Sequence, residues 1–484
     1  MSRTRALAFA AALPIVLAGL TAGAQSLQTP PAVSAPLAPA PIQMPPLTPA
    51  QAAVALKALQ SADLHGLQPK DYLPTDPGNA EALTKGLLDY ARDVRVGRLA
   101  LGEFPELWAL RPAPYDPKAD LAKALADDRL QAFLDSLPPR YAGYHAMRRG
   151  LARYRDIAAK GGWRPVPAGP SMGLGSADPR VAALRARLAA EDPQVAVAGP
   201  ATFDQPLQLA VQRAQLRYGV KPDGVAGPGT LRYLNEPVGQ RILQIIANMD
   251  RWRWLPPTMP ATRVQVNSGA AIVTLFRDDK PVLSMKAVSG KPGDETPMMT
   301  SAIHSVVINP PWNVPSSIAE QELWPKERAE PGYLARNGYR VITVEGGSPR
   351  LQQASGDDSA LGRFKFDFDN AFAVYLHDTP AKAGFDAYAR QASHGCVRVE
   401  KPRELAEALL AKDPLWTPEK IDEALGDGSK TLRVRLTEQV PVFIMYWTSF
   451  AGSDGQMHFR SDSYGWDRQL LQLTGVLAPP AKQA

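Results

Sequence analysis

The segment QASHGCVRVE, residues 391–400, contains Cys396, the single cysteine of this 484-residue sequence. One cysteine cannot form a disulfide within its own chain, so it is either a small buried side chain or a reactive thiol. The preceding Ser393, His394 and Gly395 are polar or conformationally free, which is typical of a loop or turn. This setting favours a reactive thiol in a turn.

A histidine lies close enough in the sequence to serve this thiol. His377 belongs to the run FAVYLHD, residues 372–378, and precedes Cys396 by 19 residues. A free thiol is mostly protonated at neutral pH, and a neighbouring imidazole can take its proton and hold the thiolate as an ion pair. Asp378 can orient the ring through its side chain or carbonyl, and the N–H groups of Gly395 and Cys396 can form an oxyanion hole. Together these groups predict acyl transfer.

The same residue types also suggest a metal site as an alternative. His377, His394 and Cys396 would supply three ligands in a zinc hydrolase. A single residue separates His394 from Cys396, which is a poor spacing for zinc, and no acidic base is evident nearby. We therefore expect neither a metal nor another cofactor.

The N-terminus predicts export. Residues 1–24 have the pattern of a signal peptide, with two arginines, an apolar stretch and an Ala-Gly-Ala cleavage site. An uncleaved signal anchor is the alternative. No cysteine stands directly after the apolar stretch, at the expected cleavage site, so a lipid anchor is not expected. No later run of about 18 apolar residues predicts a membrane span. Residues 25–47 are rich in Pro and Ala and predict an extended linker.

The formal net charge of +6 is mild, and no run of basic residues supports nucleic-acid binding. Residues 48–170 show apolar positions at intervals of three and four, which predicts helices. Residues 237–257 return to this pattern, and we expect both ranges to form one helical scaffold domain. His65 and His145 are isolated within it, and we interpret them as structural.

Residues 177–236 form a separate compact unit, because two amphipathic stretches are followed by a Gly-rich turn and a third short helix. The sequence DGVAGPGTLRYLN, residues 223–235, resembles part of the three-helix peptidoglycan-binding domain. A generic three-helix module is the alternative.

After Pro257 the pattern changes to alternating, β-branched stretches that predict strands. We assign residues 258–475 to one mainly β domain with helices near 401–410 and 418–425. Residues 314–362 interrupt this pattern with short helical pieces, so we interpret them as a possible lid over a cleft. His304 and His458 lie in strands away from Cys396 and are interpreted as structural.

The segments YLHDTP and SHGCVRV together resemble the signature of the YkuD-type L,D-transpeptidases. Three further segments are similar to the long periplasmic, YcbB-like branch of this family: KPGDETPMMTSAIHSVVINPPWNVP, EPGYLARNGY and LGRFKFDF. The resemblance extends from residue 48 to the C-terminus. Many relatives have asparagine where this sequence has Arg398, which leaves the substrate contacts open.

The resemblance implies a periplasmic enzyme that exchanges one peptide bond for another through a cysteine thioester. Cys396 would be the nucleophile and His377 the general base and acid, with His394 supporting and the Gly395 backbone in the oxyanion hole. The residues expected to contact the substrate are Arg398, Tyr375, Trp312 and Ser393.

The fold class that follows is multidomain α+β: a helical scaffold with a small three-helix insertion, and a mainly β catalytic domain. The expected product is a 3→3 cross-link in peptidoglycan, so the partners are its stem peptides and glycan. An L,D-carboxypeptidase or wall-peptide hydrolase using the same Cys/His pair is one alternative. A non-catalytic peptidoglycan-binding scaffold is the other.

Overall fold

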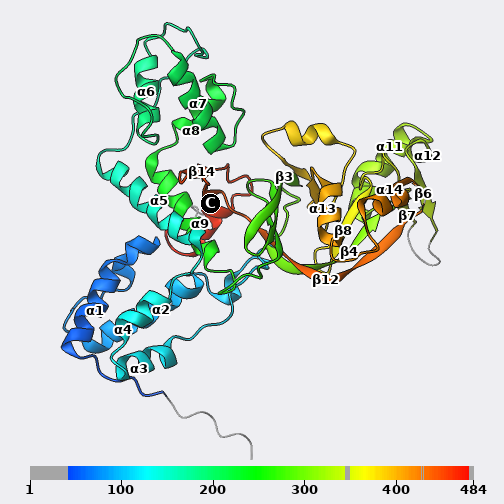
Figure 1. Ribbon diagram of the computed structural model, residues 1–484. Helices are drawn as coiled ribbons and strands as arrows, with labels where there is room; N and C mark the ends of the chain where they lie inside the picture. Colours follow the sequence, from blue (N-terminus) through cyan, green and yellow to red (C-terminus); the bar gives the residue numbers. More distant parts are fainter. Residues whose placement is uncertain (1–41, 344–348, 427, 429, 479–484) are drawn as a thin grey trace, which may run out of the picture. The chain divides into compact units, whose positions relative to one another are not determined.

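The computed structural model describes residues 42–343, 349–426, 428 and 430–478 (Figure 1). The predicted signal peptide, residues 1–24, and the predicted linker up to residue 41 lie outside this part of the chain. Among the described residues, no helix combines the length and apolar character needed to span a membrane.

The first helical region begins where the sequence has its clearest start signal. The Thr48 side chain accepts a hydrogen bond from the Gln51 N–H, and the Gln51 side chain bonds back to the Thr48 N–H, which is a capping box. The first four α-helices share one apolar core. The helices of this region are α1 (Pro49–Gln60), α2 (Ala80–Val96), α3 (Lys118–Ala126), α4 (Leu130–Ser136) and α5 (Ala142–Ala159), with 3-10 turns η1 (Ala62–His65), η2 (Pro69–Asp71) and η3 (Leu101–Glu103).

The small unit that follows has three helices, α6 (Val181–Ala189), α7 (Gln205–Tyr218) and α8 (Pro228–Leu234). Helix α7 begins at the Asp204 cap and ends at Gly219, whose φ of 66° is left-handed and therefore suits glycine. Glu191, just after α6, is buried and accepts hydrogen bonds from Arg187 of α6 and Tyr154 of α5. This carboxylate therefore connects the unit to the first helical region.

Helix α9 (Val238–Trp252) packs against α5, and the C-terminal part of the chain joins the same core. That part contains β13 (Ser449–Ala451), β14 (Met457–Phe459) and α15 (Trp466–Leu473). Its Tyr446, Trp447, Phe459 and Trp466 lie in the apolar core that includes α5 and α9. The assignment of residues 258–475 to one domain did not predict that the end of this range packs on α5 and α9. Apolar periodicity shows that a face is buried, but it does not show which element covers that face.

The mainly β domain contains a nine-stranded sheet in the order β10-β3-β11-β9-β8-β4-β12-β1-β2. An additional pairing of β2 with β3 closes this order into a ring. Helices α13 (Pro402–Leu410) and α14 (Pro418–Gly426) contribute to its core. The strands are β1 (Arg263–Asn267), β2 (Ile272–Arg277), β3 (Lys280–Gly290), β4 (Met299–Ile308), β8 (Phe364–Phe368), β9 (Leu376–His377), β10 (Gln391–Ser393), β11 (Val397–Val399) and β12 (Leu432–Met445). The 3-10 turn η5 (Lys382–Asp386) lies between β9 and β10.

An insertion between β4 and β8 has a small apolar cluster of its own and a three-stranded sheet in the order β5-β7-β6. It covers most of the segment interpreted from the sequence as a possible lid, residues 314–362. Its elements are β5 (Trp312–Asn313), α10 (Ser316–Ile318), the π-helical turn η4 (Ala319–Leu323), α11 (Trp324–Ala329), α12 (Tyr333–Arg336), β6 (Tyr339–Ile342) and β7 (Arg350–Gln353). The predicted α+β class, with helices first and a mainly β domain after them, is confirmed.

Candidate active site

The short strands β9 and β11 bring the predicted base and nucleophile to one face of the sheet. They are parallel neighbours, with Leu376 opposite Val397 and His377 opposite Arg398. Side chains alternate along a strand, and Leu376 and Val397 are fully buried in the core of the domain. His377 and Arg398 therefore project from the opposite face, and Cys396, two residues before Arg398, is directed to that face as well.

Tyr375 lies between the thiol and the inserted segment. It precedes His377 by two residues, and the two rings meet edge to face with centres 5.6 Å apart. Its hydroxyl lies close to the Cys396 thiol and to the indole of Trp312, which is in β5. The Lys365 ammonium lies 4.1 Å from the centre of the tyrosine ring. Tyr375 is therefore in contact with the nucleophile, and Trp312 is linked to it through this hydroxyl.

The imidazole of His377 is held in one orientation by the backbone. Its Nδ1 lies 2.5 Å from the carbonyl oxygen of Asp378. A carbonyl only accepts, so Nδ1 carries the proton and Nε2 is the basic nitrogen. The Asp378 carboxylate is used elsewhere, because it accepts hydrogen bonds from the Thr379 and Arg363 N–H groups. Of the two orienting groups that the sequence left open, the carbonyl is the one that contacts the ring.

Burial keeps this pair uncharged at rest. Desolvation, with a smaller contribution from the Arg398 charge, lowers the pKa of His377 to about 3. Desolvation also raises the pKa of the Cys396 thiol, although Tyr375, Lys365 and Arg398 act in the opposite direction. The ion pair expected from the sequence is therefore not the favoured resting state, because the burial of both groups penalises separated charge. A neutral imidazole is nevertheless the form that accepts a proton.

The turn that carries the thiol is fixed by hydrogen bonds. Gly395 has a φ of 103°, a backbone conformation that other residues rarely adopt. The Ser393 hydroxyl donates to the Cys396 carbonyl at 2.5 Å, and the Ser393 carbonyl accepts from the Lys291 N–H at 2.9 Å. Ser393 is almost fully buried, so the structure places it as a support of the turn.

His394 is directed toward the inserted segment. Its Nε2 lies 2.6 Å from the Glu322 carboxylate of η4, and its side chain is about one-third exposed. The supporting role predicted for His394 stays a prediction. Sequence reasoning missed Glu322, since an acidic residue in a short helical segment 72 residues away carries no local signal of this contact.

Arg398 lies beside the thiol with unused hydrogen-bonding capacity. Its Nε is buried and has no hydrogen-bond partner in the described part of the chain. Burial lowers the pKa of its guanidinium, and the neighbouring Cys396 acts in the opposite direction. A partly desolvated cation of this kind suits a carboxylate ligand, which is the role expected from the sequence.

The zinc alternative has no ligand set among the described residues. No group of three His, Cys, Asp or Glu side chains is placed there to hold a metal ion. The Nδ1 of His377 contacts the Asp378 carbonyl, and the Nε2 of His394 contacts the Glu322 carboxylate.

Three parts of the sequence match profiles of known families. Residues 261–418 match YkuD, described as the L,D-transpeptidase catalytic domain. Residues 46–151 match a "Scaffold domain", and residues 177–234 match a "Putative peptidoglycan binding domain". Residues 261–418 are therefore similar to the catalytic domain of the YkuD L,D-transpeptidases, and residues 177–234 are similar to a putative peptidoglycan-binding domain.

A curated relative from Haemophilus influenzae, named "Putative L,D-transpeptidase", is 35% identical over 221 residues. The matched region is 42% of this chain and 44% of the relative, so the chain spans less than half of the relative's length. Among solved structures, an L,D-transpeptidase from Mycobacterium smegmatis is 16% identical with a TM-score of 0.20, covering 38% of this chain and 58% of its own. The catalytic domain of an E. faecium L,D-transpeptidase is 17% identical with a TM-score of 0.18, covering 39% of this chain and 98% of its own.

Proposed function

We propose that this protein is a cysteine-dependent L,D-transpeptidase that forms 3→3 cross-links in peptidoglycan. The proposal is supported by the parallel pairing of β9 with β11, which sets His377 opposite Arg398 and close to the turn that ends in Cys396, and by the His377 Nδ1 contact with the Asp378 carbonyl, which leaves Nε2 as the basic nitrogen. The match of residues 261–418 to the YkuD family supports the reaction class.

In the first half-reaction, Nε2 of His377 accepts the thiol proton as the Cys396 sulfur attacks the carbonyl carbon of the third residue of a tetrapeptide stem. The tetrahedral oxyanion is stabilised by backbone N–H groups of the turn, for which Gly395 and Cys396 are the candidates. The C–N bond to the terminal D-alanine then breaks, and its nitrogen takes the proton from His377. A thioester remains on the sulfur.

In the second half-reaction, the side-chain amine of a diamino acid on a neighbouring stem attacks the thioester. His377 takes a proton from this amine, the C–S bond breaks, and the sulfur is protonated again. Arg398 is proposed to bind a substrate carboxylate, and Tyr375 and Trp312 to line the cleft. Transfer to water instead of an amine would make the same site an L,D-carboxypeptidase.

We further propose that the domains have the boundaries predicted from the sequence and that the enzyme acts in the periplasm. The peptidoglycan-binding domain at residues 177–234 supports a role close to the cell wall. The inserted segment 314–362 is proposed to act as a lid that shields the thioester from water, and the contact of its Glu322 with His394 supports this role.

The test is to incubate the enzyme with purified sacculi and to analyse the muropeptides. We expect 3→3 dimers from the wild-type protein and none from Cys396→Ala, because the thioester cannot form without the sulfur. Trimmed stems without dimers would favour the carboxypeptidase. The non-catalytic scaffold would be favoured if neither protein changes the muropeptides and Cys396→Ala still binds the sacculi.

A further inference from the structure

A buried threonine also supports the turn that carries Cys396. Thr296 is fully buried, and its hydroxyl donates a hydrogen bond to the Gly395 carbonyl at 2.7 Å. The same oxygen accepts a hydrogen bond from the Gly290 N–H at 2.9 Å. The hydroxyl is therefore fixed in direction, because its single proton is donated to the Gly395 carbonyl while its oxygen accepts from the Gly290 N–H.

This contact determines the direction of the next N–H group. The Gly395 carbonyl and the Cys396 N–H belong to one planar peptide unit, in which a trans bond points them in opposite directions. Holding the carbonyl against the buried Thr296 therefore turns the Cys396 N–H away from it. No group in the described part of the chain accepts a hydrogen bond from this N–H, so it is available to a ligand.

Thr296 is itself held in place by the C-terminal part of the chain. The Tyr464 hydroxyl donates to the Gly290 carbonyl at 2.7 Å and accepts from the Thr296 N–H at 3.4 Å. The space is tight, because a Cβ added at Gly290 would lie 1.9 Å from the Asp294 carbonyl oxygen. The backbone around Thr296 therefore has little freedom to move.

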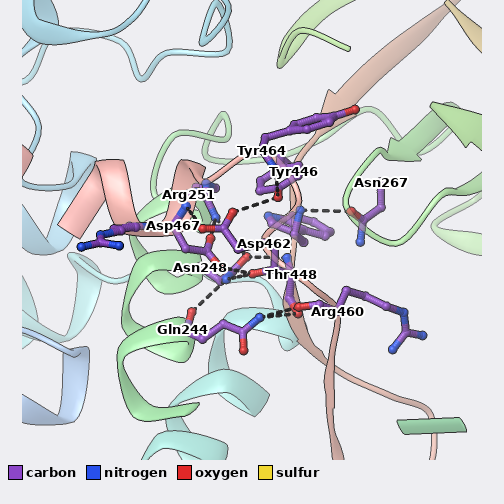
Figure 2. A network of polar contacts seen from close by, with 12 residues as sticks. Gln244, Asn248, Arg251, Asn267, Tyr446, Thr448, Arg460, Asp462, Tyr464 and Asp467 are labelled. Atoms are coloured by element: carbon purple, nitrogen blue, oxygen red, sulfur yellow. Dashed lines mark hydrogen bonds and ion pairs between the residues drawn. The ribbon is translucent and has the colours of Figure 1, made fainter. Parts of the chain in front are cut away.

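Figure 2 shows the polar network that fixes Tyr464. Its ring stacks on Tyr446 with centres 4.9 Å apart, and its N–H donates to the Tyr446 hydroxyl at 3.1 Å. That hydroxyl donates to Asp462, which also accepts from the Asp467 N–H at the start of α15. Asp467 is paired with Arg251 of α9. A continuous series of contacts thus joins α9 to the catalytic turn.

We propose that Thr296 is a positioning residue that aims the Cys396 N–H at the developing oxyanion, and that Tyr464 keeps Thr296 in place. This inference rests on the proposed function, since it concerns the acylation of Cys396. It predicts that loss of the Thr296 hydroxyl impairs attack on a carbonyl carbon but leaves the thiol reactive toward a carbon that forms no oxyanion.

The experiment compares two reactions of the same sulfur in the full chain. A carbapenem acylates Cys396: a C–S bond forms, the lactam C–N bond breaks, and the nitrogen takes the proton. Iodoacetamide alkylates it by displacing iodide from a saturated carbon, with no oxyanion. For Thr296→Val we expect the acylation rate to fall by about tenfold or more and the alkylation rate to change by less than about twofold. Mass spectrometry measures both rates.

The control variants separate positioning from folding. Thr296→Ser keeps the hydroxyl and should restore most of the acylation rate, and Thr300→Val, at an exposed position of β4, should behave as the wild type. Tyr464→Phe removes the hydroxyl that contacts the Thr296 N–H, so this variant should also show slower acylation and unchanged alkylation. Unchanged acylation in both Thr296→Val and Tyr464→Phe, or a parallel loss of both reactions in each, overturns the proposal. A wild-type protein that is alkylated but never acylated refutes the proposed function, and the inference with it.

Discussion

At the scale of residues, the central feature is that burial disfavours the charged forms of both Cys396, the proposed nucleophile, and His377, the proposed base. His377 is buried and has a lowered pKa, so it stays unprotonated at physiological pH, and Cys396 keeps its proton. Proton transfer must then accompany attack on the substrate. Lys365 and Arg398 favour the thiolate as it forms.

The raised pKa of Cys396 predicts how the thiol titrates. Because the folded pKa lies above the ordinary value, the thiolate forms only at higher pH, and alkylation by iodoacetamide should still be rising at a pH where a free cysteine has reached its plateau. The measurement is the alkylation rate from pH 5 to 10, with the urea-unfolded protein as control, whose thiol titrates near about 8.5. A plateau already reached below about pH 7 would instead indicate the ion pair expected from the sequence.

At the scale of elements, the turn between β10 and β11 is fixed on several sides. Ser393 and Lys291 hold its backbone, and the inserted segment reaches it through Glu322 and His394. The insertion has its own apolar cluster and small sheet, which are separate from the core of the ring of strands. The contact between Glu322 and His394 is the polar link on which a closed position would depend.

Breaking that link should favour water as the acceptor. Glu322→Gln removes the carboxylate that contacts the His394 ring, and a partly exposed polar contact of this kind is worth up to about 1 kcal/mol. We expect the ratio of hydrolysed stems to cross-linked dimers to rise by about two- to fivefold. The matched control is Glu320→Gln, at an exposed position of the same helical turn. An equal ratio in both variants and the wild type would remove the support for a lid.

At the scale of the whole molecule, the C-terminal segment makes the catalytic domain dependent on the helices. Tyr446, Trp447, Phe459 and Trp466 are buried in the core that includes α5 and α9. Aromatic side chains bury about 150–250 Å² each, so at about 25 cal/mol per Å² the burial of four of them contributes about 15–25 kcal/mol, which is at least as large as the net stability of a typical domain. This core therefore combines residues of the helical region with residues of the C-terminal segment.

This packing predicts the behaviour of fragments. A fragment of residues 258–475, the predicted catalytic domain, should expose these four aromatic residues and therefore aggregate or bind a hydrophobic dye. The fragment 42–478, which keeps α5 and α9, should be monodisperse. Size-exclusion chromatography and dye fluorescence measure the difference, and a well-behaved fragment 258–475 with near-native thermal stability would contradict the expected dependence.

The sequence by itself predicted Cys396 as nucleophile and His377 as base, and it marked the strand that ends at His377 and the turn before Cys396, because a two-residue alternation and a polar turn are local patterns. Only the tertiary structure decided that the Asp378 carbonyl orients His377, that Glu322 pairs with His394, and that Thr296 and Tyr464 support the turn. These partners are far apart in the chain or leave the choice of atom open, so no local pattern marks them. The resting protonation of the pair was likewise decided by tertiary structure, since burial sets the cost of charge and packing sets burial.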